Sequence, residues 1–510
     1  MATLVGALDR NASQYPEREA LVGDGRRWTW KNLGEDVAEL AGRLATAGLR
    51  SGDRCAIVSG NAPEFILALY GVLSAGGVAV PINTRLAPPE VAYQLDDSGA
   101  AVVLAAPASA ALATAAADLV EGARPSLFSI GQSPDLPDID GLAPQPPSGH
   151  RAEESDDAFI IYTSGTTGKP KGVLMDHHRA IWAALANIVG MEMADGQRYL
   201  HVTPMYHAGG VLFSNVTTLL GGTNVILPKF SAEAALDAIE AERIGMLMAV
   251  PTILQLLLED ARLASRDLSS WRVAVFGAAS TSSSVIEELF AKLPHVRFYQ
   301  GMSQTESGPA GLSSSPAELQ ARPDATAHGP LPFIAMRICD PHGHPVQIGE
   351  PGELHLRGES VMKGYWNLPD KTQEALQDGW LRTGDIVRQD PDGAVTLVDR
   401  IADVIMTGGR NVYSAEVEAV LKQHPAALDC AVIGRPHEKF GETVVAVVSV
   451  APDATLTLDE LKEFCEGRIA DYKIPRELVT QPLPRNATGK LLKHQLRDSL
   501  AEGSDRISVG

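Results

Sequence analysis

Strand-like apolar runs alternate with helix-like segments along most of the chain, and this alternation constrains the fold more than any other feature. The strand-like runs are "CAIVS", "VAVPIN", "AVVLAA", "FIIYTS", "TNVILP", "RVAVFGAA" and "VRFYQGM", with helix-like stretches such as "SAEAALDAIEAERI" between them. Strands connected through helices form largely parallel sheets that helices cover. We therefore predict an α/β fold whose ligands bind beyond the carboxyl ends of its strands.

The last third of the chain has a different pattern, which predicts further domains. Short strands punctuated by glycine, such as "GELHLRG" and "GWLRTGDIV", indicate a β-rich subdomain over about 330–398. A compact α+β segment follows Arg400. With 510 residues the chain is too long for one ordinary core. We predict a large N-terminal domain at 1–398, a hinge at 399–403 and a small C-terminal domain at 404–510.

Charge and cysteine content narrow the class of protein. The net charge of −20 argues against a general binder of nucleic acid or of anionic membranes. The four cysteines lie far apart without a CxxC pair, which favours a reducing compartment over a zinc site or disulfides. Arg10 interrupts the first apolar segment, and no apolar run approaches the roughly 18 residues of a membrane span. We expect a cytoplasmic enzyme; the oligomeric state stays open.

The stretch "YTSGTTGKPKG", Tyr162 to Gly172, directly follows the strand-like run "AFIIY". Its glycines allow backbone N–H groups to approach an anion, its hydroxyls add donors and its two lysines add positive charge. Pro170 stands where a Walker A loop needs serine or threonine to hold magnesium, so this is not that loop. The stretch predicts a phosphate-binding loop; a plain polar surface loop is the alternative.

These residues resemble the phosphate-loop signature of the adenylate-forming (AMP-binding) superfamily, which includes acyl-CoA synthetases, luciferase, peptide-synthetase adenylation domains and amide-bond synthetases. Further resembling segments occur in the family's order along nearly the whole chain. They are "PINTRL", "YQLDDSGA", "PMYHAGG", "FGAAS", "QTESG", "GELHLRG", "LRTGD", "DRIADVI", "GGRNVYSAEVE" and "PRNATGK". The resemblance implies a large α/β domain with stacked sheets and a β-rich subdomain, followed by a small mobile α+β domain that acts as a lid.

The resemblance also implies a reaction, in which ATP activates a carboxylic acid to an acyl-AMP and pyrophosphate leaves. Lys490 would bridge the carboxylate and the α-phosphate, Thr305 would donate to that phosphate, and Glu306 would bind Mg²⁺. Asp385 would bind the ribose hydroxyls, with Arg400 on the ribose and phosphate side. The remaining residues implied for ATP or AMP are Thr163, Ser164, Gly165, Thr166, Thr167, Gly168, Lys169, Lys171, Ala278, Ala279 and Met302.

The acyl site is implied by several small or apolar positions and by His207, which would contact the carboxylate or gate the pocket. Small side chains at the glycines would leave room for an apolar or aromatic acid, and Ile253 would add apolar surface. The residues implied to line this pocket are Tyr206, His207, Val211, Val250, Gly277, Gly301 and Gly308.

Transfer of the acyl group to CoA is the second step that we expect. Gly408 and Gly409 match glycines that admit pantetheine, and Arg410, Lys439 and Arg435 are candidates for the nucleotide end.

Three positions depart from the family pattern. Met302 replaces an adenine-stacking aromatic, Ala402 replaces Asp or Lys at the hinge, and Ser414 replaces a proline. Because an amine acceptor needs no pantetheine tunnel, an ATP-dependent amide-bond synthetase is the alternative.

Overall fold

The computed structural model describes residues 2–145, 152–163, 169–279, 281–451, 454–485, 491–502 and 508–509. The chain forms two compact units. Unit 1 comprises Met1–Met336 and Leu356–Arg382, and unit 2 comprises Arg337–His355 and Thr383–Gly510. Unit 2 therefore takes in part of the β-rich region that we predicted at about 330–398. The hinge at 399–403 concerns a movement and stays a prediction.

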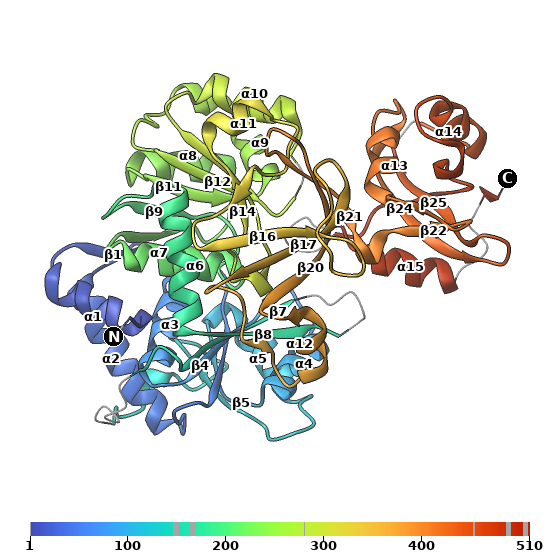
Figure 1. The fold of residues 1–510 in the computed structure, drawn as a ribbon. Coiled ribbons are helices and arrows are strands. Elements are labelled where there is room, and N and C mark those ends of the chain that lie inside the picture. The colour runs from blue at the N-terminus through green and yellow to red at the C-terminus, as the bar shows by residue number, and fades with distance from the viewer. Residues whose placement is uncertain are drawn as a thin grey trace. The chain divides into compact units, whose positions relative to one another are not determined.

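A nine-stranded sheet forms one half of unit 1, in the order β15-β14-β13-β12-β11-β9-β10-β1-β2 (Figure 1). Its six central strands are parallel, and β14 and β2 pair antiparallel at the two sides. The strands are β1 Glu19–Gly23, β2 Arg26–Thr29, β9 Arg198–His201, β10 Thr223–Ile226, β11 Met246–Ala249, β12 Val273–Gly277, β13 Arg297–Met302, β14 Leu312–Ser314 and β15 Gly329–Pro330.

A seven-stranded sheet forms the other half, in the order β18-β8-β7-β4-β3-β5-β6. Here β8 pairs antiparallel with both β7 and β18, whereas β7 and the strands beyond it are parallel. The strands are β3 Arg54–Val58, β4 Val78–Pro81, β5 Ala100–Ala105, β6 Ser126–Ser129, β7 Asp157–Thr163, β8 Lys171–Asp176 and β18 Gly364–Tyr365.

Helices cover both sheets of unit 1 because the parallel strands are apolar on both faces. One group of helices shares a core with both sheets and so lies between them; it comprises α1 Leu4–Gln14, α2 Trp30–Thr46, α3 Pro63–Ser74, α6 His177–Gly190 and α7 Ala208–Leu219. A second group covers the far face of the nine-stranded sheet; it comprises α8 Ala232–Ala241, α9 Pro251–Glu259, α10 Ser283–Lys292 and α11 Pro316–Ala321. The far face of the seven-stranded sheet is covered by α4 Pro88–Ser98 and α5 Ala110–Ala117.

Unit 2 contains a six-stranded sheet in which β23, β22, β25, β26 and β27 follow one another and β24 pairs with β25. Helices α13 and α14 pack on one face of this sheet, and α15 packs on the other. The elements are β22 Ile405–Thr407, β23 Arg410–Val412, α13 Ser414–Leu421, β24 Ala427–His437, β25 Gly441–Val450, α14 Leu458–Cys465, β26 Glu477–Thr480, α15 Lys493–Glu502 and β27 Ser508–Val509.

The β-rich region forms a five-stranded sheet, and the division between the units falls inside three of its strands. Its elements, with the helix inserted among them, are β16 Ile334–Cys339, β17 Pro351–Gly358, α12 Pro369–Ala375, β19 Leu376–Gln377, β20 Trp380–Gln389 and β21 Val395–Arg400.

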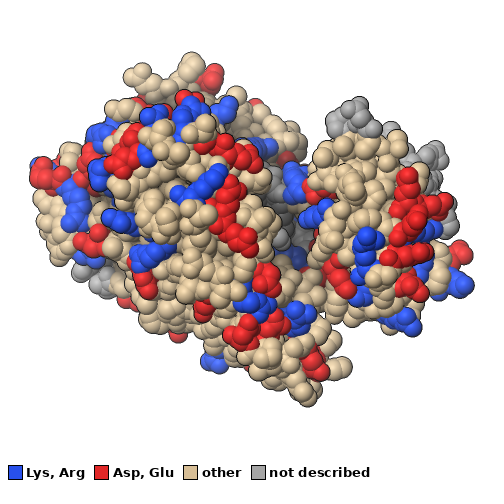
Figure 2. All heavy atoms as spheres, turned by 90° about the horizontal axis from the view of Figure 1, so that it is seen from above, with Lys and Arg blue, Asp and Glu red and all other residues tan. Residues whose placement is uncertain are grey.

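This architecture confirms the predicted α/β class with stacked sheets, a β-rich region and a smaller C-terminal domain. The side chains of all four cysteines are buried, and none of them forms a disulfide in the described part of the chain. In the described part of the chain, none of the helices combines the length and apolarity that crossing a membrane requires. On the face shown in Figure 2, lysine and arginine side chains alternate with aspartate and glutamate.

Candidate active site

Four loops of unit 1 leave the same edge of the nine-stranded sheet. Strands β9, β11, β12 and β13 are parallel neighbours, so their carboxyl ends lie side by side. The loops after them carry Tyr206 and His207, then Val250, then Ala278 and Ala279, and finally Thr305 and Glu306. The structure therefore brings together at one edge most of the acyl-site residues and the metal-binding acid expected from sequence. This is the edge at which parallel α/β sheets bind ligands.

Asn61, which the sequence analysis did not single out, fixes the loop after β9. Its side-chain amide donates to the carbonyl oxygen of Thr203 at 3.0 Å and accepts from the N–H of Met205 at 2.9 Å. The loop carries Tyr206 and His207 and ends at α7. Because buried backbone groups need partners, one amide that satisfies two of them holds the loop in a defined conformation. The string "SGNAP" contains no pattern from which this role could be predicted.

His207 is a neutral imidazole at this edge. Burial and the nearby guanidinium of Arg85 lower its pKa from 6.5 to about 4. Its Nε2 atom is buried, and no residue in the described part of the chain forms a hydrogen bond with it. Its ring meets the ring of Tyr206 edge-on at 4.7 Å, and Val211 lies buried one turn into α7. A buried ring nitrogen without a partner suits a hydrogen bond to a ligand.

The glycines expected to leave room for the acid differ in what surrounds them. A Cβ at Gly277 would lie 2.2 Å from the carbonyl oxygen of Gly301, and one at Gly308 would lie 2.2 Å from that of Ser360. Neighbouring backbone therefore accounts for these two glycines without any contribution from a substrate. A Cβ at Gly301 would meet nothing closer than 4.0 Å, so that position alone fits the expectation.

Ala278, directly after β12, has a φ of +66°, a conformation that residues other than glycine adopt rarely. It and Ala279 are exposed, which leaves them accessible to a ligand. Met302, the last residue of β13, is half-buried beside them at the same edge. Left-handed backbone of this kind is concentrated at functional sites, where the surrounding structure maintains it.

Tyr365 connects Glu306, the acid expected to bind metal, to β8, the strand after the predicted phosphate loop, although the sequence analysis did not select it. Its hydroxyl donates to Oε1 of Glu306 at 3.0 Å, and the ammonium group of Lys171 lies 4.1 Å from its ring centroid. Burial and the carboxylate of Glu306 raise the pKa of Tyr365, so its hydroxyl stays protonated and donates. Because Tyr365 pairs with β8 and Glu306 follows β13, this contact joins the two sheets of unit 1.

The segment predicted as the phosphate loop connects β7 and β8 in the chain, and these strands pair antiparallel. Thr163 ends β7, and Lys171 begins β8 rather than lying in the loop. Ser164, Gly165, Thr166, Thr167 and Gly168 lie outside the described residues. Helix α4 fixes both sides of this segment: the Tyr162 hydroxyl donates to Asp97 at 2.7 Å, and the Tyr93 hydroxyl donates to the Pro170 carbonyl oxygen at 3.1 Å. The exposed Lys169 lies over the ring of Tyr93 at 5.1 Å.

Unit 2 carries the expected ribose carboxylate. Asp385 is buried on β20, and the side-chain Nε of Arg400 on β21 lies 3.1 Å from its Oδ1. The two residues are register partners in the antiparallel pair, and the Gly384 N–H before Asp385 donates to Glu353 at 3.2 Å. The sheet therefore presents a carboxylate and a guanidinium side by side.

The turn between β22 and β23 contains Gly408 and Gly409, which have φ values of +57° and +76°. A Cβ at either glycine would meet no atom within 4 Å among the described residues, so this turn has open space around it. Lys490 lies outside the described residues. Of the basic residues expected for CoA, Arg410 lies over the Tyr472 ring at 4.9 Å, whereas Arg435 is held by Glu477 at 2.6 Å.

Comparison with known proteins identifies the family of this chain. The sequence profile of the AMP-binding enzyme family matches residues 8–366, and that of the AMP-binding enzyme C-terminal domain matches residues 416–490. A feruloyl-CoA synthase from an Amycolatopsis species is 36% identical over 96% of this chain and 97% of its own length.

Two solved structures are similar throughout. O-succinylbenzoate coenzyme A synthetase from Bacillus subtilis, solved with ATP and magnesium ion, has a TM-score of 0.85 and 30% identity over 97% of this chain and 99% of its own. The amide bond synthetase McbA from Marinactinospora thermotolerans has a TM-score of 0.85 and 28% identity over the same shares. The fold and site thus define an AMP-forming ligase, and the chain belongs to the AMP-binding enzyme family.

Proposed function

We propose that this protein uses ATP to activate a carboxylic acid to an acyl-AMP, with release of pyrophosphate, and then transfers the acyl group to CoA. The contact between Glu306, Tyr365 and Lys171 carries this proposal. It places a carboxylate suited to Mg²⁺ beside a lysine of the phosphate-loop strand, at the sheet edge where ligands bind. Membership of the AMP-binding enzyme family and the CoA ligases among the relatives support the same reaction.

In the first step an oxygen of the carboxylate attacks the α-phosphorus of ATP. Two anions meet, so the protein's task is to position them and to offset negative charge. We assign Lys169, Lys171 and the loop from Thr163 to the leaving phosphates. Thr305 would donate to the α-phosphate, and Lys490 would contact the transition state.

Glu306 is the residue that we expect to hold Mg²⁺, which would offset phosphate charge when bound. No group of three or more metal-binding side chains occurs within the described ranges. A single carboxylate with phosphate oxygens and water is an ordinary Mg²⁺ arrangement, so Glu306 fits this role. Tyr365 orients the carboxylate of Glu306 by donating a hydrogen bond to one of its oxygens, which leaves the other oxygen available.

The acid is expected to have an apolar or aromatic body. Val211 is buried and Val250 half-buried near the loop that carries His207, and the neutral imidazole adds no charge to the pocket. We expect Nε2 of His207, or the proton it carries in one tautomer, to form a hydrogen bond with the substrate. Pockets of this composition bind apolar ligands and orient them with a few polar groups.

We favour CoA over an amine as the acceptor, and a feature of unit 2 supports this choice. A hollow with a volume of about 570 Å³ is lined by Arg410, Ala470, Asp471, Tyr472 and Arg476. Two guanidinium groups and an aromatic ring suit the phosphates and the base of a nucleotide. Gly408 and Gly409 stand immediately before Arg410 in the chain. The similarity to an amide bond synthetase keeps transfer to an amine as the second candidate.

The test supplies ferulate, 2-succinylbenzoate, benzoate and decanoate, each with ATP and Mg²⁺. We expect at least one acid to support ATP–pyrophosphate exchange without any acceptor. Adding CoA or benzylamine then identifies the product by mass spectrometry. Accumulation of an acyl-CoA supports the proposal, accumulation of the benzylamide selects the alternative, and absence of exchange with every acid contradicts both.

A further inference from the structure

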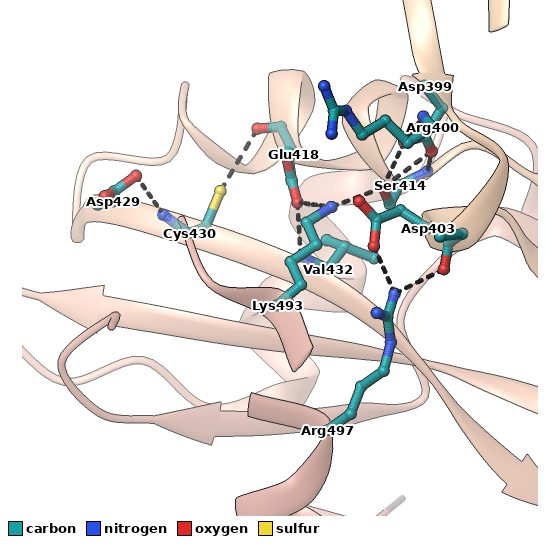
Figure 3. A network of polar contacts seen from close by, with 11 residues as sticks. Asp399, Arg400, Asp403, Ser414, Glu418, Asp429, Cys430, Val432, Lys493 and Arg497 are labelled. Atoms are coloured by element: carbon teal, nitrogen blue, oxygen red, sulfur yellow. Dashed lines mark hydrogen bonds and ion pairs between the residues drawn. The ribbon is translucent and has the colours of Figure 1, made fainter. Parts of the chain in front are cut away.

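A buried network of polar side chains in unit 2 is not used by the reaction as described so far (Figure 3). It joins Asp399, at the end of β21, to Ser414 at the start of α13, and then to Lys493 at the start of α15 and Glu418 on α13. We define these four residues as the hinge network, because Asp399 begins the segment predicted as the hinge.

Ser414 is the centre of the hinge network. Its hydroxyl donates to Asp399 at 2.8 Å, and its backbone N–H donates to the same carboxylate. The hydroxyl oxygen also accepts a hydrogen bond from the Lys493 ammonium at 2.6 Å. Proline, the residue that the family pattern has at this position, has neither the N–H nor the hydroxyl and could not make these bonds.

Lys493 contributes a cationic side chain to the hinge network. Its Nζ atom lies 2.7 Å from Oε1 of Glu418, and its side chain is only 12% exposed. Ser414 and Asp399 are also buried, at 0% and 5% exposure. A buried ion pair is costly to desolvate and contributes little net stability, so such a pair is better explained by the geometry it imposes.

The hinge network contacts Arg400, a residue of the proposed site, through Asp399. Asp399 accepts a hydrogen bond from the backbone N–H of Arg400 at 2.7 Å, and Arg400 reaches the ribose carboxylate Asp385. On the other side, Lys493 directly follows a paired stretch of backbone, since the Leu492 N–H donates to the Pro484 carbonyl oxygen at 2.9 Å. Arg497, one turn beyond Lys493, holds Asp403 at 2.6 Å (Figure 3).

We propose that Lys493 is a positioning residue for adenylation, because through Ser414 it fixes Asp399 and thereby orients Arg400 toward the ribose and phosphate side of ATP. This inference rests on the proposed function. It assigns a role to a side chain that touches no reactant, and to a serine that departs from the family pattern.

The experiment measures acid-dependent ATP–pyrophosphate exchange for Lys493→Met, Lys493→Arg and a matched control, Lys473→Met. Lys473 is a good control because it is also largely buried and pairs with Glu416 of the same helix at 2.6 Å, away from Asp399. We expect Lys493→Met to lower the exchange rate about tenfold or more, Lys493→Arg to retain most of it, and the control to match the wild type.

A double-mutant comparison separates positioning from mere stability. If Lys493 acts through Arg400, Lys493→Met should cost less than about threefold in an Arg400→Ala background. Reaction of presynthesised acyl-AMP with CoA should also fall much less than adenylation.

Equal losses in both backgrounds, equal losses in both half-reactions, or an equal loss in the Lys473→Met control would overturn the inference. If Lys493→Met fails to fold, Ser414→Ala replaces it, since it removes the connecting hydroxyl but keeps the N–H bond to Asp399. Absence of exchange in the wild-type protein with every acid would instead refute the proposed function itself.

Discussion

At the scale of single residues, Tyr365 shows how a side chain outside the expected motifs can organise the site. Its hydroxyl donates to Glu306 while its ring lies under Lys171, so one residue contacts both the acid that we expect to bind Mg²⁺ and the strand after the predicted phosphate loop. It follows a glycine in "KGYWN", and nothing in the composition or spacing of this string suggests a role in catalysis. Candidate site residues within the motifs could be predicted because their side chains are of the types that the proposed reaction needs. Tyr365 could not be predicted, because it meets Glu306 only when the two sheets pack together.

Replacing Tyr365 with phenylalanine tests this role. The change keeps the ring for Lys171 but removes a hydrogen bond to a carboxylate, so we expect about a 3- to 10-fold higher Mg²⁺ concentration for half-maximal exchange. Tyr70→Phe is the control, because it removes a buried hydroxyl bond of 2.7 Å to Thr218 elsewhere in unit 1. An equal Mg²⁺ dependence in both variants would show that Tyr365 does not orient Glu306.

Lys490 carries the strongest mechanistic expectation among single residues. Lys490→Ala should reduce adenylation about 10²-fold or more, because in our proposal it removes the cation that offsets the charge developing on the α-phosphate. Reaction of presynthesised acyl-AMP with CoA should be largely retained. Rapid-quench measurement of each half-reaction checks this, and the assigned role is wrong if the two rates fall together.

At the scale of elements, the paired ends of β12 and β13 explain a glycine that the sequence alone left ambiguous. Alternation of strands and helices was enough to predict the α/β sheets and their ligand-binding edge, since each element has its own periodicity. The distance between two neighbouring strand backbones, in contrast, produces no periodic pattern in the sequence. Gly277 therefore suggested space for a substrate, whereas in the structure a Cβ at this position would lie 2.2 Å from the Gly301 carbonyl oxygen.

A pair of alanine substitutions separates these two interpretations of the glycines. Gly277→Ala should destabilise unit 1 by about 1–3 kcal/mol, because its Cβ would lie 2.2 Å from backbone that cannot move freely. Gly301→Ala should leave the thermal unfolding midpoint close to that of the wild type, since its nearest neighbours are at 4.0 Å. Similar midpoints for the two variants would refute the packing explanation.

At the scale of the whole molecule, the proposed cycle needs two half-reactions that use different surfaces of unit 2. The family resemblance predicted from the sequence that the two half-reactions use different surfaces, because the motifs of both steps occur in the chain. The turn at Gly408 and Gly409 offers a way to separate the steps, because it has open space around it and belongs, in our proposal, only to the second one.

Gly409→Leu should therefore keep acid-dependent pyrophosphate release for a first turnover while acyl-CoA formation collapses and acyl-AMP stays bound. Gly409→Ala is the matched control. Both variants share the strain of a φ of +76°, but only leucine would fill the path that we propose for the pantetheine of CoA. Undiminished acyl-CoA production by the leucine variant would show that CoA does not pass this turn. Amide formation that survives the change would favour an amine acceptor.

The central claim is that a carboxylate oxygen attacks the α-phosphorus of ATP, and oxygen tracing tests it most directly. An accepted acid labelled with ¹⁸O in its carboxylate is converted with ATP, Mg²⁺ and CoA, and the nucleotide product is analysed by mass spectrometry. The account predicts AMP that carries one ¹⁸O atom, because the bond from the carboxylate oxygen to phosphorus persists when the thiol takes the acyl group. Formation of ADP, or AMP without label, would contradict it.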